Sequence, residues 1–140
     1  MTEEEDIREN KGISWLAYIS VLFLIPMLAK KDSKFCEYHV RQGAMLFVLE
    51  IAFTVVSQLF LAVIGAVIRG INSTTYYIIN YHMSPVYMIF NVLFLLVDIA
   101  FVVLSVMGIL NALGGKKKEL PIIGKIPLIE PLLDKFYSKN

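Results

Sequence analysis

The stretch Gly43–Ile68, GAMLFVLEIAFTVVSQLFLAVIGAVI, decides the fold, because Glu50 is the single charged side chain among its 26 residues. The stretch Val86–Leu113 has the same character, with Asp98 as the single charge among 28 residues. A helix needs about 20 mostly apolar residues to cross the hydrocarbon core of a bilayer. The helices of a soluble bundle would each carry a strongly polar face, which these stretches lack. The sequence therefore predicts membrane-spanning helices at about residues 43–68 and 86–113.

A third apolar stretch, Ile13–Ala29, has 17 residues without a charge. As a helix it would reach about 25 Å, near the lower limit for a span. We therefore expect an all-α integral membrane protein with three transmembrane helices, the first at about residues 13–29. An acidic N-terminal tail (1–12) would precede the three-span membrane domain (13–126), and a proline-interrupted, amphipathic cytoplasmic tail (127–140) would follow it.

The composition excludes several classes of protein. Hydrophobic residues make up 57% of the chain, against about 45–50% in ordinary soluble proteins, and the mean hydropathy is +0.67. Disordered chains are poor in apolar residues, and the lone Cys36 excludes a disulfide scaffold. A net charge of +1 argues against a nucleic-acid partner. We recognise no nucleophile–base pair and no phosphate-binding loop, so we expect neither an enzyme nor a cofactor.

Basic residues are distributed unevenly around the three expected spans. The N-terminal tail and the second loop together hold three Lys and Arg residues, whereas the first loop and the C-terminal tail hold ten. Loops rich in Lys and Arg stay on the cytoplasmic side. With three spans, the count predicts a multi-pass protein of the cell membrane with its N-terminus outside and its C-terminus in the cytoplasm.

The first loop predicts a helix that begins near Lys34, since Asp32 and Ser33 are favourable N-caps. This interfacial helix would turn Phe35 toward lipid before it leads into the second span. Cys36 and His39 share a face of this helix, but they supply only half of a four-ligand metal site. We therefore expect no bound metal.

The second loop is rich in tyrosine, as is typical of the aromatic belt at a membrane interface. Asn72-Ser73-Thr74 is in addition a formal N-glycosylation sequon on the expected outer side. The belt would consist of Trp15, Tyr76, Tyr77, Tyr81 and Tyr87.

Polar side chains recur at heptad-like spacing in the two long apolar stretches, which is typical of helix faces that meet other helices. From the depth of each residue in antiparallel spans, we expect Asp98 to contact Ser57 or Gln58, and Glu50 to contact Ser105. Placing a carboxylate at the centre of a transmembrane helix costs about 2.5–3.5 kcal/mol of insertion free energy. A carboxylate at such a position is therefore a candidate for a functional role. The candidate interaction residues are Glu50, Ser57, Gln58, Asn91, Asp98 and Ser105.

Two functions are compatible with this pattern. In the first, the polar residues join helices, and the chain is a non-enzymatic membrane interaction, assembly or translocation-related factor. Its partners would be the lipid bilayer and either further copies of itself or other membrane proteins. In the alternative, the chain is a small transporter or channel subunit in which Asp98 and Glu50 relay protons or cations.

The first loop also carries the pattern K-x-S-x-F followed by H-x-x-Q, and the last span ends in Asn111-Ala112, glycine and then Pro121. This pattern resembles small prokaryotic membrane proteins of unknown function that are related to the Tic translocon component of the chloroplast inner envelope. The resemblance implies an all-helical membrane protein with its first loop at the cytoplasmic face. As an alternative to a functional role, His39 and Gln42 would serve as anchors that bond backbone or headgroups where the interfacial helix leads into the second span. The residues of this interface motif are Lys31, Ser33, Phe35, His39, Arg41 and Gln42.

Overall fold

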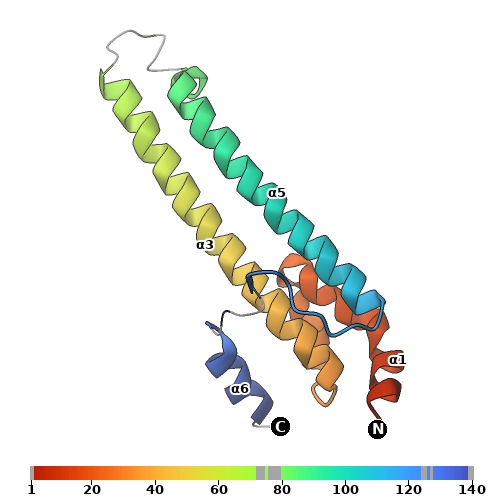
Figure 1. Ribbon diagram of the computed structural model, residues 1–140. Coiled ribbons are helices and arrows are strands. Elements are labelled where there is room, and N and C mark those ends of the chain that lie inside the picture. Colours follow the sequence, from red (N-terminus) through yellow and green to blue (C-terminus); the bar gives the residue numbers. More distant parts are fainter. Residues whose placement is uncertain (1, 72–74, 76–79, 124–125, 127, 139–140) are drawn as a thin grey trace. The chain divides into compact units, whose positions relative to one another are not determined.

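The computed structural model describes residues 2–71, 75, 80–123, 126 and 128–138, and these residues contain helices and no strand. The expected all-α class is therefore confirmed. In chain order the elements are α1 (Glu3–Ser14), η1 (Trp15–Tyr18), η2 (Ser20–Phe23), α2 (Leu24–Ala29), α3 (Lys34–Ile71), η3 (Tyr81–Met83), α5 (Pro85–Leu113) and α6 (Glu130–Ser138) (Figure 1).

The chain forms two compact units, which we describe separately. The terminal unit consists of Met1–Leu49 and Phe101–Asn140, and the helix-pair unit consists of Glu50–Ala100. Each of the two long helices, α3 and α5, contributes one part to each unit.

Helices α3 and α5 are two candidate membrane-spanning helices, with 38 and 29 residues. Within their most apolar windows, 22% of the residues of α3 and 6% of those of α5 are buried by the rest of the chain. The core helix of a soluble protein would be mostly buried instead. The expected spans at residues 43–68 and 86–113 lie inside these helices, and the expected interfacial helix is the first part of α3.

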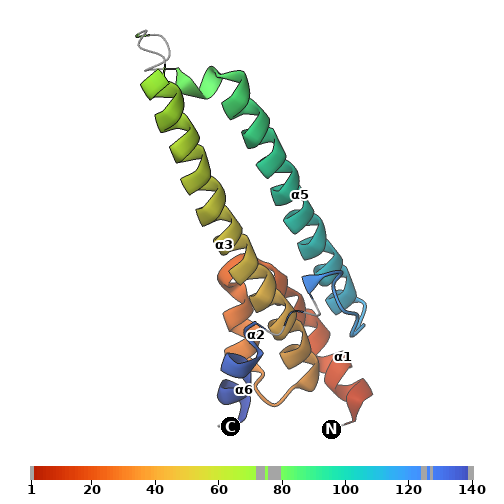
Figure 2. The same ribbon diagram turned by 60° about the vertical axis from the view of Figure 1, so that its left-hand side comes forward.

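The expected first span, Ile13–Ala29, is wrong as a single helix. α1 ends at Ser14, and two short 3₁₀ turns precede α2. The chain reverses at the start of the second turn, where Ser20 has a φ of 44°, so that α2 contacts α1 (Figure 2). The apolar helical run that remains, Ser20–Ala29, is too short to cross a bilayer. The stretch folds back because its small and aromatic residues pack against protein, as described below, instead of facing lipid.

Local capping explains where the long helices begin and end. The Ser33 hydroxyl accepts a hydrogen bond from the Cys36 amide at 3.0 Å, so α3 begins at Lys34 as the sequence predicts. After α5, Gly115 adopts a φ of 66°, and the Lys116 amide donates to the Asn111 carbonyl at 2.9 Å. This is the Schellman arrangement that favours glycine after a helix.

The terminal unit has a core to which the N-terminal hairpin, both long helices and the C-terminal segment contribute. The buried residues of this core are Ala17, Tyr18, Val40, Met45, Leu46, Ala112, Leu120 and Ile123. Further along the chain, the nine-residue helix α6 holds Pro131 in its first turn, where a missing amide proton costs no hydrogen bond. Pro127 lies outside the described residues.

Contacts inside the terminal unit also correct the expected orientation. The Asp6 carboxylate of α1 accepts a hydrogen bond from the Phe35 amide of α3 at 3.0 Å, and Glu3 forms an ion pair with Lys117 at 2.9 Å. A bilayer cannot lie between residues in such contact. The prediction that the N-terminal tail lies opposite the first loop and the C-terminal tail is therefore wrong. That prediction depended on a first span at residues 13–29, which the structure does not contain as a single helix.

In the helix-pair unit, aromatic contacts define how α3 and α5 pack. The ring centroids of Phe53 and Phe94 lie 5.8 Å apart, and those of Phe60 and Phe90 lie 4.9 Å apart. Later residues of α3 thus contact earlier residues of α5, which makes the pair antiparallel. Near the end of the pair, the Tyr81 ring packs against Gly65, which leaves it room.

Candidate functional site

A row of buried polar residues runs through the N-terminal hairpin. Asp6, Asn10, Ser14 and Tyr18 follow one another at four-residue spacing, which places them on one face of α1 and η1. All four are buried. Because they contact the first turns of α3, we call these four residues, together with Ser33, Cys36 and His39 of the facing segment, the polar junction.

The Asp6 carboxylate organises the beginning of α3. It accepts hydrogen bonds from the Ser33 hydroxyl, from the Phe35 amide at 3.0 Å and from the Asn10 side-chain amide at 2.8 Å. Burial raises the pKa of Asp6. Together, these hydrogen bonds and the charge of Lys117 lower the pKa by more than burial raises it, so the pKa of Asp6 lies below its ordinary value. A carboxylate at a helix N-terminus also interacts favourably with the helix dipole. Asp6 is therefore an ionised cap that α1 supplies to α3.

The next two polar contacts lie further along the same helices. The Ser14 hydroxyl lies 3.1 Å from the Cys36 sulfur, and the Tyr18 hydroxyl lies 2.9 Å from His39 Nδ1. The His39 ring is fully buried and has its nearest aromatic neighbour in Phe35, with centroids 4.6 Å apart. Phe35 is itself 0% exposed, so the expectation that it faces lipid is wrong.

Two glycines allow η1 to approach both long helices. A Cβ atom at Gly43 would lie 1.8 Å from the Ala17 carbonyl oxygen, and one at Gly108 would lie 2.3 Å from the Tyr18 ring. Small residues permit such close packing of helices. Tyr18 therefore contacts α3 through His39 and α5 through Gly108.

The remaining residues of the interface motif bind the C-terminal segment. Gln42 Oε1 accepts a hydrogen bond from the Leu120 amide at 2.9 Å, so Gln42 bonds backbone as expected. Arg41 forms ion pairs of 2.6 Å with Glu37 and with Asp134 of α6. The Lys31 ammonium lies 5.2 Å from the centre of the Phe136 ring. The structure thus brings all six motif residues into contact with the N-terminal or the C-terminal segment.

A tail at residues 1–12 and a span at residues 13–29, as the sequence predicts, give no role to Asp6, Asn10, Ser14 or Tyr18. One signal was available, since polar residues at positions 6, 10, 14 and 18 have the spacing of one helix face. The pattern of the first loop predicts the motif residues but not their partners in the hairpin.

The candidate interaction residues of the helix-pair unit do not pair as expected. Ser57 is buried and donates to the Thr54 carbonyl at 3.0 Å, whereas Gln58, Asn91 and Asp98 are exposed. Among the described residues, no hydrogen bond joins Asp98 to Ser57 or Gln58.

The helix register explains this difference. The contact between Phe60 and Phe90 places Asp98 level with about residue 52 of α3, so it lies about 9 Å from Gln58 along the helix axis. The expected contact between Glu50 and Ser105 joins residues of different units, and it stays a prediction.

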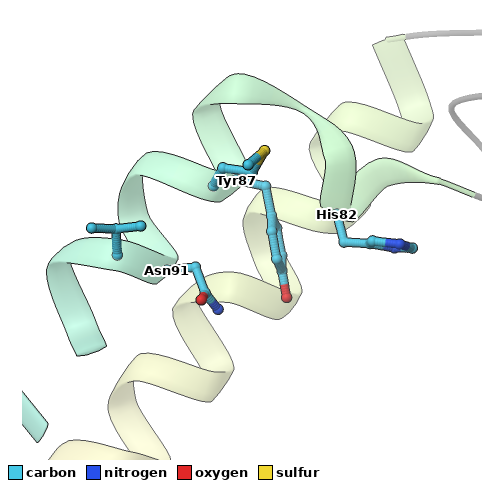
Figure 3. A pocket seen from close by; sticks show the side chains of 5 residues that line it. His82, Tyr87 and Asn91 are labelled. Atoms are coloured by element: carbon cyan, nitrogen blue, oxygen red, sulfur yellow. The ribbon is translucent and has the colours of Figure 1, made fainter.

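Asn91 also lines an open pocket of about 300 Å³ at the start of α5, together with His82, Tyr87, Met88 and Val92 (Figure 3). In this view the Tyr87 and Asn91 side chains point to the same side of the helix, and His82 points away from them. Within the described ranges, no group of three His, Cys, Asp or Glu side chains is placed to hold a metal ion.

Three features of the second loop lie outside the described residues. They are the sequon Asn72-Ser73-Thr74, Tyr76 and Tyr77. No protein-family model, curated protein or solved structure matches this chain. The resemblance of the first loop to Tic-related proteins therefore stays a prediction.

Proposed function

We propose that the chain is an integral protein of the cell membrane in which α3 and α5 cross the bilayer. The apolar surface of these helices supports insertion, since side chains such as Leu59 and Leu96 are 63% and 57% exposed. Of the 13 Lys and Arg residues, Arg69 alone lies between Gln42 and Gly115 in the sequence. By the positive-inside rule, both termini then lie in the cytoplasm.

We further propose a non-enzymatic role in membrane interaction or assembly, and the single observation that carries it is the exposure of Asp98. This carboxylate lies near the middle of α5 among exposed apolar residues such as Val97 and Ile99. A carboxylate that faces lipid costs about 2.5–3.5 kcal/mol, and contact with a polar group of another helix offsets that cost. The resemblance of the first loop to Tic-related proteins favours a translocation-related role.

A specific observation also favours the alternative, a small transporter or channel subunit. The register that places Asp98 level with about residue 52 brings it within about 3 Å, along the helix axis, of the level of Glu50. Two carboxylates at one depth are an arrangement that proton relays in membranes use.

Reconstitution of the full chain in nanodiscs and in liposomes separates the two functions. For an assembly factor, we expect the wild type to occur in a complex, Asp98→Leu to form less of it, and the matched variant Ile99→Leu to form as much as the wild type. Proton or cation flux through liposomes should then stay at the level of empty vesicles. A monomeric wild type with a flux that Asp98→Asn abolishes would contradict the assembly role and support the relay.

A further inference from the structure

Four exposed polar side chains interrupt the apolar surface of α3 between residues 51 and 68 and of α5 between residues 86 and 100. Thr54 and Gln58 lie four residues apart on α3, and Asn91 and Asp98 lie seven residues apart on α5. Each spacing places the two residues of a pair on one face of their helix. A polar group that faces lipid without a hydrogen-bond partner is costly. In a bilayer, these four residues would therefore be more stable in contact with polar groups of another protein surface than in contact with lipid.

The aromatic contacts show that the two pairs lie on the same side of the helix pair. Phe60 of α3 contacts Phe90 of α5, so these rings mark one edge. At about 100° per residue, Gln58 points about 160° away from Phe60. Asn91 points about 100° away from Phe90 in the direction that passes Phe94, which also contacts Phe60.

The Phe60 and Phe90 rings mark one edge of the helix pair. The rotation from Phe60 to Gln58 and the rotation from Phe90 to Asn91 both lead away from that edge, so Gln58 and Asn91 lie at the opposite edge. Thr54 and Gln58 therefore share one lateral face with Asn91 and Asp98. We call these four residues the polar face.

The polar residues of the two helices also match in depth. The contact between Phe60 and Phe90 places Gln58 level with about residue 92 of α5, one position from Asn91. In the same register Thr54 is level with about residue 96, so it lies about 3 Å along the axis from Asp98. Each polar residue on α3 thus has a polar counterpart on α5 at nearly its own depth.

We propose that a second copy of this chain docks on the polar face and forms a two-fold four-helix assembly. A 180° rotation about an axis parallel to the helices keeps every residue at its depth and sets α3 of one copy against α5 of the other. Gln58 then faces Asn91 of the second copy, and each of these amides has both donors and an acceptor. The Thr54 hydroxyl donates to Asp98 of the second copy, and each pairing occurs twice.

Self-complementarity is the reason why the occupant is a second copy. Gln58 and Thr54 of α3 lie at the depths of Asn91 and Asp98 and can form hydrogen bonds with them. The two-fold rotation places Gln58 and Thr54 of one copy opposite Asn91 and Asp98 of the other. The opposite edge, with exposed Val56 and Leu93, is apolar and suits lipid. The inference rests on the proposed function, because the cost of exposed polar groups applies only when α3 and α5 lie in a bilayer.

Disulfide crosslinking between differently tagged full-length copies tests this assembly in native membranes. Cys36 is the single native cysteine, and Cys36→Ala in both copies leaves one thiol per chain. One copy carries Gln58→Cys and the other carries Asn91→Cys, so only contact between copies yields a mixed-tag disulfide. The matched control combines Val56→Cys with Leu93→Cys, which are exposed, level with each other in the same register and on the opposite edge.

We expect efficient mixed-tag crosslinking for Gln58→Cys with Asn91→Cys and little for the control pair. Asp98→Leu should weaken association of the copies about three- to tenfold, as measured by energy transfer between labelled chains in liposomes. Equal crosslinking of both pairs, or crosslinking through the control pair alone, would overturn the proposal. Absence of crosslinks in a chain that resists alkaline extraction also overturns it, whereas release of the chain from membranes by alkali contradicts the proposed function instead.

Discussion

The terminal unit and the helix-pair unit treat their polar residues in opposite ways. In the terminal unit, Asp6 and His39 are buried, and each contacts a partner within the chain. In the helix-pair unit, Gln58 and Asp98 are exposed along helices whose surface is otherwise apolar. The first unit therefore gives its polar groups partners within the chain, whereas the second leaves these polar groups on its surface.

Glycines sharpen the same comparison. A Cβ at Gly43 in the terminal unit would meet backbone, the Ala17 carbonyl oxygen at 1.8 Å. A Cβ at Gly65 in the helix-pair unit would meet the Tyr81 ring at 2.6 Å, and a side chain that borders a loop moves more easily than backbone. The terminal unit therefore tolerates an added methyl group at Gly43 less well than the helix-pair unit tolerates one at Gly65.

The largest effect is expected for Gly43→Ala. Because the added methyl group overlaps backbone, η1 must separate from α3, and we expect a loss of about 3 kcal/mol in the free energy of unfolding. Gly65→Ala should cost less than about 1 kcal/mol, since a ring can shift. Thermal unfolding in detergent measures both, with fluorescence of Trp15, the single tryptophan, as the reporter in the terminal unit.

Gly12→Ala is the control for the glycine substitutions. A Cβ at Gly12 meets nothing within 4 Å, and alanine favours the interior of α1. This variant should be as stable as the wild type or slightly more so. An unfolding midpoint for Gly43→Ala equal to that of Gly12→Ala would contradict the tight contact between η1 and α3.

The second effect in size is expected for Asp6→Asn. The substitution removes an ionised acceptor that receives bonds from Ser33 and the Phe35 amide, and we expect a cost of about 2 kcal/mol at neutral pH. The pKa of Asp6 is lowered in the folded chain, so its contribution is complete above its ordinary value of 3.8. The contribution is lost as the pH falls through the lowered pKa.

The stability of the wild type and of Asp6→Asn should therefore converge in acid below pH 3.8. Glu9→Gln, at an exposed position of the same helix, should leave the unfolding midpoint unchanged at every pH. A difference between wild type and Asp6→Asn that persists unchanged into acid would show that the carboxylate charge is not what stabilises the junction.

Local physical chemistry made part of this structure predictable. The lengths of the apolar stretches predict α3 and α5, and Ser33 predicts where α3 begins, because capping depends on a few neighbouring residues. The hairpin at Ile13–Ala29 was not predictable in this way, since an apolar run has the same composition whether it packs against lipid or against protein. The expected contact of Asp98 with Ser57 or Gln58 does not form, because depths counted from the ends of each stretch differ from the register that the contact of Phe60 with Phe90 shows.

The smallest difference in stability between the two units is expected when a tyrosine hydroxyl is removed from each. Tyr18→Phe keeps the ring against Gly108 but removes the hydrogen bond to His39, so we expect a cost of about 1 kcal/mol. Tyr87→Phe in the helix-pair unit keeps the ring contact with Tyr81 and should leave stability nearly unchanged. Chemical unfolding followed by far-UV circular dichroism measures both variants. If the two hydroxyls prove equally dispensable, the buried contact between Tyr18 and His39 contributes no net stability, and packing around the two glycines must hold η1 in place.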